Sequence, residues 1–224
     1  MHHTKHESWA LSKSSFIKGK QCAKYLFLDK HKKEERTPPS KETQALFKQG
    51  HNFEDRFRYS EFPDGINLKD ELKWNFGHYN SKTRQLLSTH DQCTLFEAGI
   101  IEDDILILMD VLRKNANGTF DFYEIKLHNK ISEVIWQDLR IQYYVCKKRF
   151  GPAINSFNIV HRVGESGWVV KDVLCELEIM IQGIETEIEE FKRVLKLKSV
   201  PGIEMGDQCR DPYLCPFVGY CKRV

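Results

Sequence analysis

The chain has 224 residues, of which 41% are apolar, 12% aromatic and 29% charged; this excludes disorder as its main state and allows a sizeable core. Lysine and arginine outnumber the acids by 34 to 32, so the net charge of +2 does not by itself require a nucleic-acid partner. The first 25 residues lack the apolar segment of a secretory signal, and the longest apolar run, Ile105–Met109, is too short to span a membrane. We therefore expect a cytoplasmic protein with no membrane partner, whose seven cysteines are thiols or metal ligands rather than disulfides.

The first third of the chain predicts helices. Apolar spacing and capping residues indicate one helix over 12–30, a second over 43–60 and a third over 80–89. The second helix should turn four apolar side chains inward: Leu46, Phe47, Phe53 and Phe57. Residues 11–33 carry seven lysines against one aspartate, which is either a solvated helix face or a contact surface for phosphates.

The middle of the chain predicts strands. Three segments rich in β-branched and aromatic residues, 94–101, 105–113 and 119–127, indicate an antiparallel meander. There follow a helix over 132–150, a strand over 154–163, a turn at 164–167, a short fifth strand and a long amphipathic helix from 172 to about 195. We expect an α/β fold with a central mixed sheet flanked by helices.

A carboxylate lies inside the apolar strand 105–113. Alternation places Asp110 on the same face as Leu112, and places Glu124 and Lys126 on one face of the next strand. A hairpin would bring the two carboxylates together, so that one holds a proton or both bind a cation such as Mg²⁺ or Mn²⁺. Such an ion, with a lysine to orient a water, supplies what phosphodiester hydrolysis needs. The simpler alternative is an ion pair between Asp110 and Lys126.

The order of these residues resembles the PD-(D/E)XK nuclease superfamily, and its RecB-like members in particular. Asp110 matches the first acid and Glu124-Ile125-Lys126 matches (D/E)-x-K. Gln142 matches the glutamine of Gln-x-x-x-Tyr, although Cys146 stands where that motif has tyrosine.

This resemblance implies a restriction-endonuclease-like fold. It also implies a metal site formed by Asp110, Glu124 and the carbonyl of Ile125, with Lys126 positioning the water. Gln142 would orient DNA or Lys126. Glu54 lies four residues after Gly50, where RecB-like nucleases carry a histidine that supports the metal; His51 and Glu97 are weaker candidates.

Three cysteines, Cys209, Cys215 and Cys221, are spaced Cys-x5-Cys-x5-Cys in a tail that also contains prolines and a glycine. They are well spaced to wrap one metal centre, for which Cys22 is the best fourth ligand. The remaining three cysteines are predicted to be core residues: Cys93, Cys146 and Cys175.

The cysteine pattern resembles the iron–sulfur subset of RecB-like nucleases, which includes CRISPR-associated exonucleases of the "Cas-four" type and the AddB nuclease domain. In these proteins one cysteine precedes the nuclease core and three follow it. The tail looks closer to a group of uncharacterised bacterial proteins with such a module, because its first gap is longer than the usual Cys-x2-Cys-x5-Cys. The resemblance implies a 4Fe–4S cluster; zinc, or four unrelated thiols, remain the alternatives.

Taken together, these patterns predict a single RecB-like nuclease domain over 1–224, with its core at about 42–171 and cluster-binding segments at about 11–33 and 205–224. We expect a Mg²⁺- or Mn²⁺-dependent deoxyribonuclease of the exonuclease kind that the resemblance implies, acting on single-stranded DNA or DNA ends. Protein partners in defence or repair would fit the same resemblance. The alternatives are a catalytically inactive DNA-binding or scaffolding module of the same fold, or a zinc-stabilised nuclease module of a larger protein.

Weaker DNA contacts are predicted at both ends of the core. Lys18, Lys20 and Lys24, with Lys13, would line a DNA path, which the cluster at 147–149 would extend. Tyr143 or Tyr144 would stack on a base if its ring is exposed.

Overall fold

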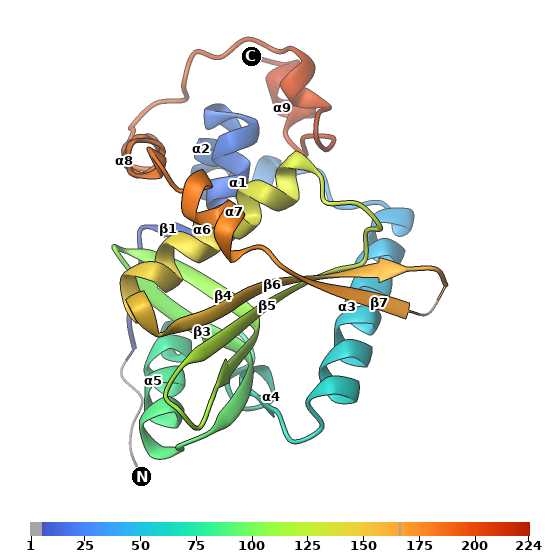
Figure 1. The fold of residues 1–224 in the computed structure, drawn as a ribbon. Coiled ribbons are helices and arrows are strands. Elements are labelled where there is room, and N and C mark those ends of the chain that lie inside the picture. Colours follow the sequence, from blue (N-terminus) through green and yellow to red (C-terminus); the bar gives the residue numbers. More distant parts are fainter. Residues whose placement is uncertain (1–5, 166) are drawn as a thin grey trace.

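A computed structural model describes residues 6–165 and 167–224 of the chain. It has a mixed α/β fold in which helices flank a seven-stranded mixed sheet (Figure 1). The sheet order is β2-β3-β4-β5-β6-β7, and β1 pairs with β4 outside this path. The turn predicted at 164–167 includes residue 166, which lies outside the described residues.

The sheet combines an antiparallel meander with parallel additions. Its strands are β1 (Leu11–Ser12), β2 (Ile66–Asn67), β3 (Cys93–Glu102), β4 (Ile105–Lys114), β5 (Phe120–Lys126), β6 (Ile154–Val163) and β7 (Gly167–Asp172). The predicted antiparallel β3-β4-β5 meander is confirmed, and β6 joins it parallel to β5. β1 and β2 could not be predicted from the sequence, because a two-residue strand has no periodicity to detect.

Helices cover both faces of the sheet (Figure 1). They are α1 (Lys13–Gln21), α2 (Ala23–His31), α3 (Lys41–Glu61), α4 (Leu68–Leu72), α5 (Tyr79–Thr89), α6 (Glu133–Phe150), α7 (Leu174–Met180), α8 (Ile184–Val194) and α9 (Val218–Cys221). Short 3₁₀ turns occupy Lys33–Glu35, Phe76–His78, Gly151–Ala153 and Asp207–Cys209. None of the described helices is long and apolar enough to cross a membrane.

Two helices predicted as continuous are broken, so those predictions are wrong. Cys22 separates α1 from α2 with an extended backbone, φ −167° and ψ 125°. Gly183 separates α7 from α8 with φ 74°, a left-handed conformation that glycine adopts without steric cost. Hydrophobic spacing alone does not detect either break, because the apolar positions continue on both sides of it.

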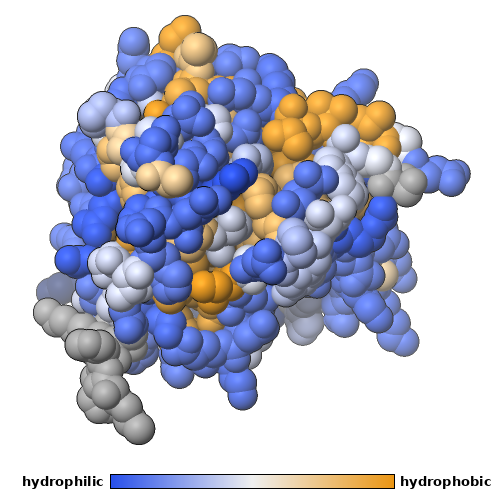
Figure 2. All heavy atoms as spheres, turned by 60° about the horizontal axis from the view of Figure 1, so that its bottom comes forward, coloured by the Kyte–Doolittle hydropathy of each residue, from blue (hydrophilic) through white to orange (hydrophobic). Residues whose placement is uncertain are grey.

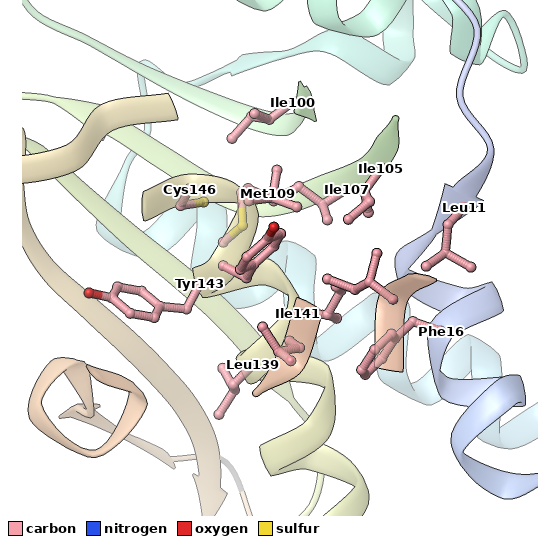
Figure 3. Close-up of a cluster of buried hydrophobic side chains, with 14 of the residues drawn as sticks. Leu11, Phe16, Ile100, Ile105, Ile107, Met109, Leu139, Ile141, Tyr143 and Cys146 are labelled. Carbon is pink, nitrogen blue, oxygen red and sulfur yellow. The ribbon is translucent and has the colours of Figure 1, made fainter. Parts of the chain in front are cut away.

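The larger core lies where α6 and α1 pack against the sheet. Figure 3 shows Ile105, Ile107 and Met109 of β4 in one cluster with Leu139, Ile141 and Cys146 of α6 and with Leu11 and Phe16. The Tyr143 ring points away from β4 and contacts Phe157 of β6. A smaller core joins α3 to the opposite side of the sheet through six buried residues: Phe53, Phe57, Phe96, Val111, Ile125 and Val160. Burial of these apolar surfaces is the main driving force for placing both helices.

Some predicted core positions lie at the surface. Leu46 and Phe47 are 59% and 58% exposed, because the first half of α3 extends past the core that Phe53 and Phe57 enter. Cys146 is buried and Cys93 packs at the margin of the core, but Cys175 is exposed on α7. The predicted inward position is therefore wrong for Leu46, Phe47 and Cys175. Figure 2 also shows an apolar area at the β6–β7 hairpin, where Val163, Val169 and Val170 are exposed.

Candidate functional site

The site begins where β4 and β5 separate, a point we call the fork. The two strands pair from Lys114 and Phe120 as far as Val111 and Tyr123. Asp110 and Glu124 come next on their strands, and there the Asp110 Oδ2 accepts a hydrogen bond from the Ile125 amide at 2.7 Å. The carboxylate thus takes the place of a ladder acceptor and is fixed beside the second acid.

Beyond the fork, the free edge of β4 pairs with β1 at Ile105 and Leu106. The first residue of α1, Lys13, follows β1 directly, and its Nζ lies 3.0 Å from Glu124 Oε1. Lys13 was predicted to line a DNA path; the structure instead places it in an ion pair inside the site.

The side chains of β3 and β4 change face at the pair Glu97 and Asp110. Phe96 and Val111 belong to the smaller core beneath α3, whereas Ala98 and Met109 belong to the larger core. Residues two apart on a regular strand share a face, so one residue of the alternation is lost here. Glu97 has φ 55°, a strained conformation for a residue with a Cβ. The regular alternation expected along the strand at 105–113 is therefore interrupted next to Asp110.

Helix α3 contributes two charged residues to the site. Arg58 is buried, and its Nη2 lies 3.0 Å from Glu97 Oε1 and 3.4 Å from Asp110 Oδ1. Glu54 lies one helical turn earlier and is half-buried. Burial, together with the charges of Glu124 and Glu97, outweighs the opposing charge of Arg58 and raises the pKa of Glu54. The weaker candidate Glu97 therefore lies in the site, as does Glu54.

The two central acids have opposite tendencies. Burial, with the charge of Glu124, holds the pKa of Asp110 well above its ordinary value. Burial acts the same way on Glu124, but Lys126 and Lys13 outweigh it and hold the pKa of Glu124 below its ordinary value. These environments favour the neutral form of Asp110 and the charged form of Glu124.

Lys126 is held from two sides. Its Nζ lies 2.6 Å from Glu124 Oε1 and 2.6 Å from Asp138 Oδ2. Despite burial, Asp138 and Glu124 hold the pKa of Lys126 well above its ordinary value. Sequence reasoning missed Asp138, whose signal is its position four residues before Gln142 on an otherwise apolar helix face.

Gln142 does not reach the surface. It is 0% exposed, and its Nε2 donates to the Asp138 carbonyl at 3.2 Å. A direct DNA contact by Gln142 is therefore excluded by its burial. Its position one turn from Asp138 is compatible with the other predicted role, orientation of Lys126.

Some of the unsatisfied buried polar atoms belong to residues of the site. Among the described residues, six buried side-chain atoms lack a hydrogen-bond partner: Arg58 Nε, Thr83 Oγ1, Glu124 Oε2, Gln142 Oε1, His161 Nδ1 and Arg162 Nε. Glu124 Oε2 is the most informative, because the other oxygen of the same carboxylate, Oε1, is already engaged by Lys13 and Lys126. A buried oxygen without a partner is costly in a finished structure and fits a site that receives a ligand.

These oxygens suit a hard divalent cation in their chemistry. The described residues contain no group of three or more histidine, cysteine, aspartate or glutamate side chains already set around a metal position. Asp110 is engaged by Ile125 and Arg58, and one oxygen of Glu124 by two lysines. Glu124 Oε2 has no such partner and is therefore the oxygen available to coordinate a cation.

The four cysteines predicted as cluster ligands line one cavity. Cys22, Cys209, Cys215 and Cys221 border a space of about 20 Å³ between α2 and the C-terminal tail. All four are free thiols. Burial raises the pKa of Cys215 to about 11, and the other three thiols act on it in the same direction. Four thiols are the donor set that an iron–sulfur cluster or zinc requires, although among the described residues no three of them stand close enough to form a ready metal site.

Hydrogen bonds hold the tail against the N-terminal helices. Gln21 Nε2 donates to the carbonyls of Gln208 and Tyr213, and Lys24 Nζ donates to that of Ile203. The break at Cys22 turns its backbone away from helical geometry between α1 and α2. These contacts bring residues 21–24 and the C-terminal tail to one cavity.

The weaker predicted DNA contacts are mostly occupied within the protein. Tyr143 and Tyr144 are 1% and 4% exposed, and their hydroxyls donate to Glu178 and Asp103. Stacking of either ring on a base is therefore excluded by its burial. Lys18 and Lys20 pair with Asp29 and Glu187, and Lys24 bonds the Ile203 carbonyl.

No family model and no curated protein matches the chain. Among solved structures, the one described as "Crystal structure of SSO0001" aligns with 89% of this chain and 90% of that chain, at 14% identity and a TM-score of 0.38. A likeness of this size assigns neither a family nor an activity.

Proposed function

We propose that the chain is a metal-dependent DNA nuclease of the RecB-like PD-(D/E)XK type with a restriction-endonuclease-like core. The observation that carries the proposal is the fork, where Asp110 and Glu124 meet, Lys126 lies 2.6 Å from Glu124, and Glu124 Oε2 has no partner. Buried charges at one point cost stability, so their concentration is typical of a site kept for chemistry.

Asp110, Glu124, Glu54 and the carbonyl of Ile125 would hold Mg²⁺ or Mn²⁺. Such an ion, when bound, lowers the pKa of a water ligand and offsets the negative charge of a phosphate. Because the pKa of Asp110 is raised, this carboxyl must release its proton before its oxygens act as ligands. Arg58 and Lys13 offset the charge of the acids in the metal-free protein.

Lys126 would position the water that attacks phosphorus. Its ammonium group lies between Glu124 and Asp138, so its orientation is fixed before substrate arrives. Gln142 and Asp138, one helical turn apart on α6, support that orientation. The water adds to phosphorus, and the bond from phosphorus to the leaving oxygen breaks.

The four cysteines would hold a 4Fe–4S cluster, with zinc as the alternative. Its role would be structural, because it would join α1 and α2 to the tail at a distance from the fork. The placement of four free thiols around one cavity supports this part of the proposal.

A second candidate is a DNA-binding or scaffolding module of the same fold without catalysis. Cys146, fully buried where the Gln-x-x-x-Tyr motif has tyrosine, favours it. The complete set of Asp110, Glu124 and Lys126 favours the nuclease.

Cleavage of a labelled single-stranded oligonucleotide in Mn²⁺ separates the two. We expect the wild type to cleave, Asp110→Asn to lose at least about a hundredfold in rate, as loss of a metal ligand does, and Asp91→Asn, an exposed acid before β3, to match the wild type. Salt-sensitive DNA binding without cleavage in any divalent metal would favour the scaffolding module.

A further inference from the structure

The first half of α3 exposes two large apolar side chains that none of the described elements covers. Leu46 and Phe47 are 59% and 58% exposed, although α3 later enters the smaller core with Phe53 and Phe57. In Figure 1, α3 runs beside the β6–β7 end of the sheet, and Trp168 of β7 contacts the Phe57 ring. The exposed part lies on the N-terminal side of these contacts.

Helical periodicity connects this surface to the fork. Phe47 precedes Glu54 by seven residues, which is two turns and about 10 Å along the axis. Residues 47, 51, 54 and 58 form one stripe, and we call it the α3 stripe. Along it the side chains pass from exposed Phe47 and His51, through half-buried Glu54, to buried Arg58 beside Asp110.

The space over the α3 stripe is open at Gly50. A Cβ added there would meet no described atom within 4 Å. Glycine weakens a helix interior, and no close neighbour requires it at this position. A ligand that passes close to the helix backbone would account for both the glycine and the open space.

Charge completes the surface. Lys48 and His51 are exposed next to Phe47, and Lys41 begins the helix. An exposed aromatic ring beside basic side chains is the combination that binds a single nucleic-acid strand, since every base has a face that can stack. A stable protein interface would need about 1,000 Å² of matched surface, far more than two apolar side chains supply.

We propose that the exposed half of α3 is the entry surface for single-stranded DNA. One base stacks on Phe47, the backbone passes over Gly50 toward the fork, and Lys48 and His51 contact its phosphates. The inference rests on the proposed nuclease for its orientation, and adds a binding subsite two helical turns from Glu54.

Binding is tested without cleavage, in an Asp110→Asn background and without metal. Fluorescence anisotropy of a labelled single-stranded oligonucleotide should show about tenfold weaker binding after Phe47→Ala, whereas Phe47→Tyr restores most of the affinity. The matched control is Trp74→Ala, which removes a 77% exposed aromatic ring away from the α3 stripe and should change nothing. A blunt duplex should bind equally to all three variants and their parent.

A second variant fills the open space. Gly50→Trp introduces a residue that helix interiors accept better than glycine, so we expect the variant to fold. Circular dichroism checks its helix content. In the otherwise wild-type chain the substitution should slow cleavage of single strands by raising KM while kcat changes little. This split follows because the residue lies on the path and not at the reacting atoms.

Each result has one meaning. Unchanged single-strand affinity after Phe47→Ala overturns the inference even if the wild type cleaves DNA. Weakened affinity in a chain that never cleaves sustains the entry surface and refutes the nuclease. A parent that sediments as a dimer and a Phe47→Ala variant that sediments as a monomer would overturn the inference, because the surface would then be an interface between copies.

Discussion

The Asp110 carboxyl is buried, and burial disfavours its ionised form. It is held in place by the Ile125 amide, yet it lies beside Glu124 in a buried setting that raises its pKa. An asparagine keeps the acceptor for Ile125 and removes the charge. We predict that Asp110→Asn raises the melting temperature of the metal-free protein near neutral pH, by about 2–4 °C for each kcal/mol gained.

The pH dependence of this gain has a definite sign. The folded-state pKa of Asp110 lies above the ordinary value of 3.8, so the stability that its proton confers is complete below about pH 4 and is lost as the pH rises through the folded-state pKa. The pKa of Glu124 is lowered, so the stability that its charge confers is lost as the pH falls. Glu124 is present in both proteins, so this effect cancels in their difference. The difference between variant and wild type should therefore be small in acid and grow toward neutral pH. A difference that shrinks with rising pH would contradict this.

Lys13 gives a second prediction at this scale. Lys13 and Lys126 are the two described cations that contact buried Glu124, so Lys13→Met leaves the buried charge with one of them. We expect a loss of up to about 3 kcal/mol in the free energy of unfolding. The control is Lys147→Met, which removes an exposed pair with Glu178 and should cost at most about 1 kcal/mol. Urea titration of both variants measures this, and equal losses would argue against a buried Lys13–Glu124 pair.

Residue patterns predicted part of the site. That Asp110, Glu124 and Lys126 lie close together was predictable, because the order and spacing of these residues on two consecutive strands are local properties. Lys13, Arg58 and Asp138 were missed because each reaches the fork through tertiary structure: a two-residue strand, a buried turn of α3 and the approach of α6 to β5. Glu97 was underrated, because its left-handed backbone cannot be foreseen from strand propensity.

Helix α3 has two different halves: the second half packs into the smaller core through Phe53 and Phe57, and the first half is exposed. Gly50 lies at the boundary, inside the helix and without close neighbours among the described atoms. We predict that Gly50→Ala raises the free energy of unfolding by about 0.5–1 kcal/mol, because alanine loses less backbone entropy in a helix. Urea denaturation measures the gain. A destabilised variant would mean that the space over Gly50 is filled in the folded protein.

Element boundaries were less predictable than element types. The meander and α6 follow from alternation and from helical periodicity. The breaks at Cys22 and Gly183 do not, because one depends on where the tail packs and the other on a turn between two helices that share an apolar stripe. The exposed start of α3 was missed for the same reason: its apolar spacing continues after the core has ended.

On the scale of the whole molecule, the cysteine cavity joins segments from opposite ends of the chain. Residues from α1 and α2 bond the tail around the four thiols. If these thiols hold a cluster, Cys22→Ser should lose bound iron and lower the melting temperature, whereas exposed Cys175→Ser should do neither. Iron and sulfide analysis of anaerobically purified protein, with thermal melts, measures both effects. Equal iron content in wild type and Cys22→Ser would exclude Cys22 as a ligand.

The overall architecture was predictable to the level of a mixed sheet flanked by helices. That level depends on the order of strands and helices, which local patterns carry. The placement of β1 beside β4, which brings Lys13 to the fork, depends on contacts between residues 11–12 and 105–106 that no local pattern contains.

The most direct measurement of the central claim is an anomalous difference map from crystals of the wild-type protein soaked in Mn²⁺. The account predicts a manganese peak at the fork, bound by Asp110, Glu124 and the Ile125 carbonyl, and its absence from crystals of Asp110→Asn. The absence of a manganese peak at the fork in fully soaked crystals, or manganese bound only elsewhere, would contradict this prediction.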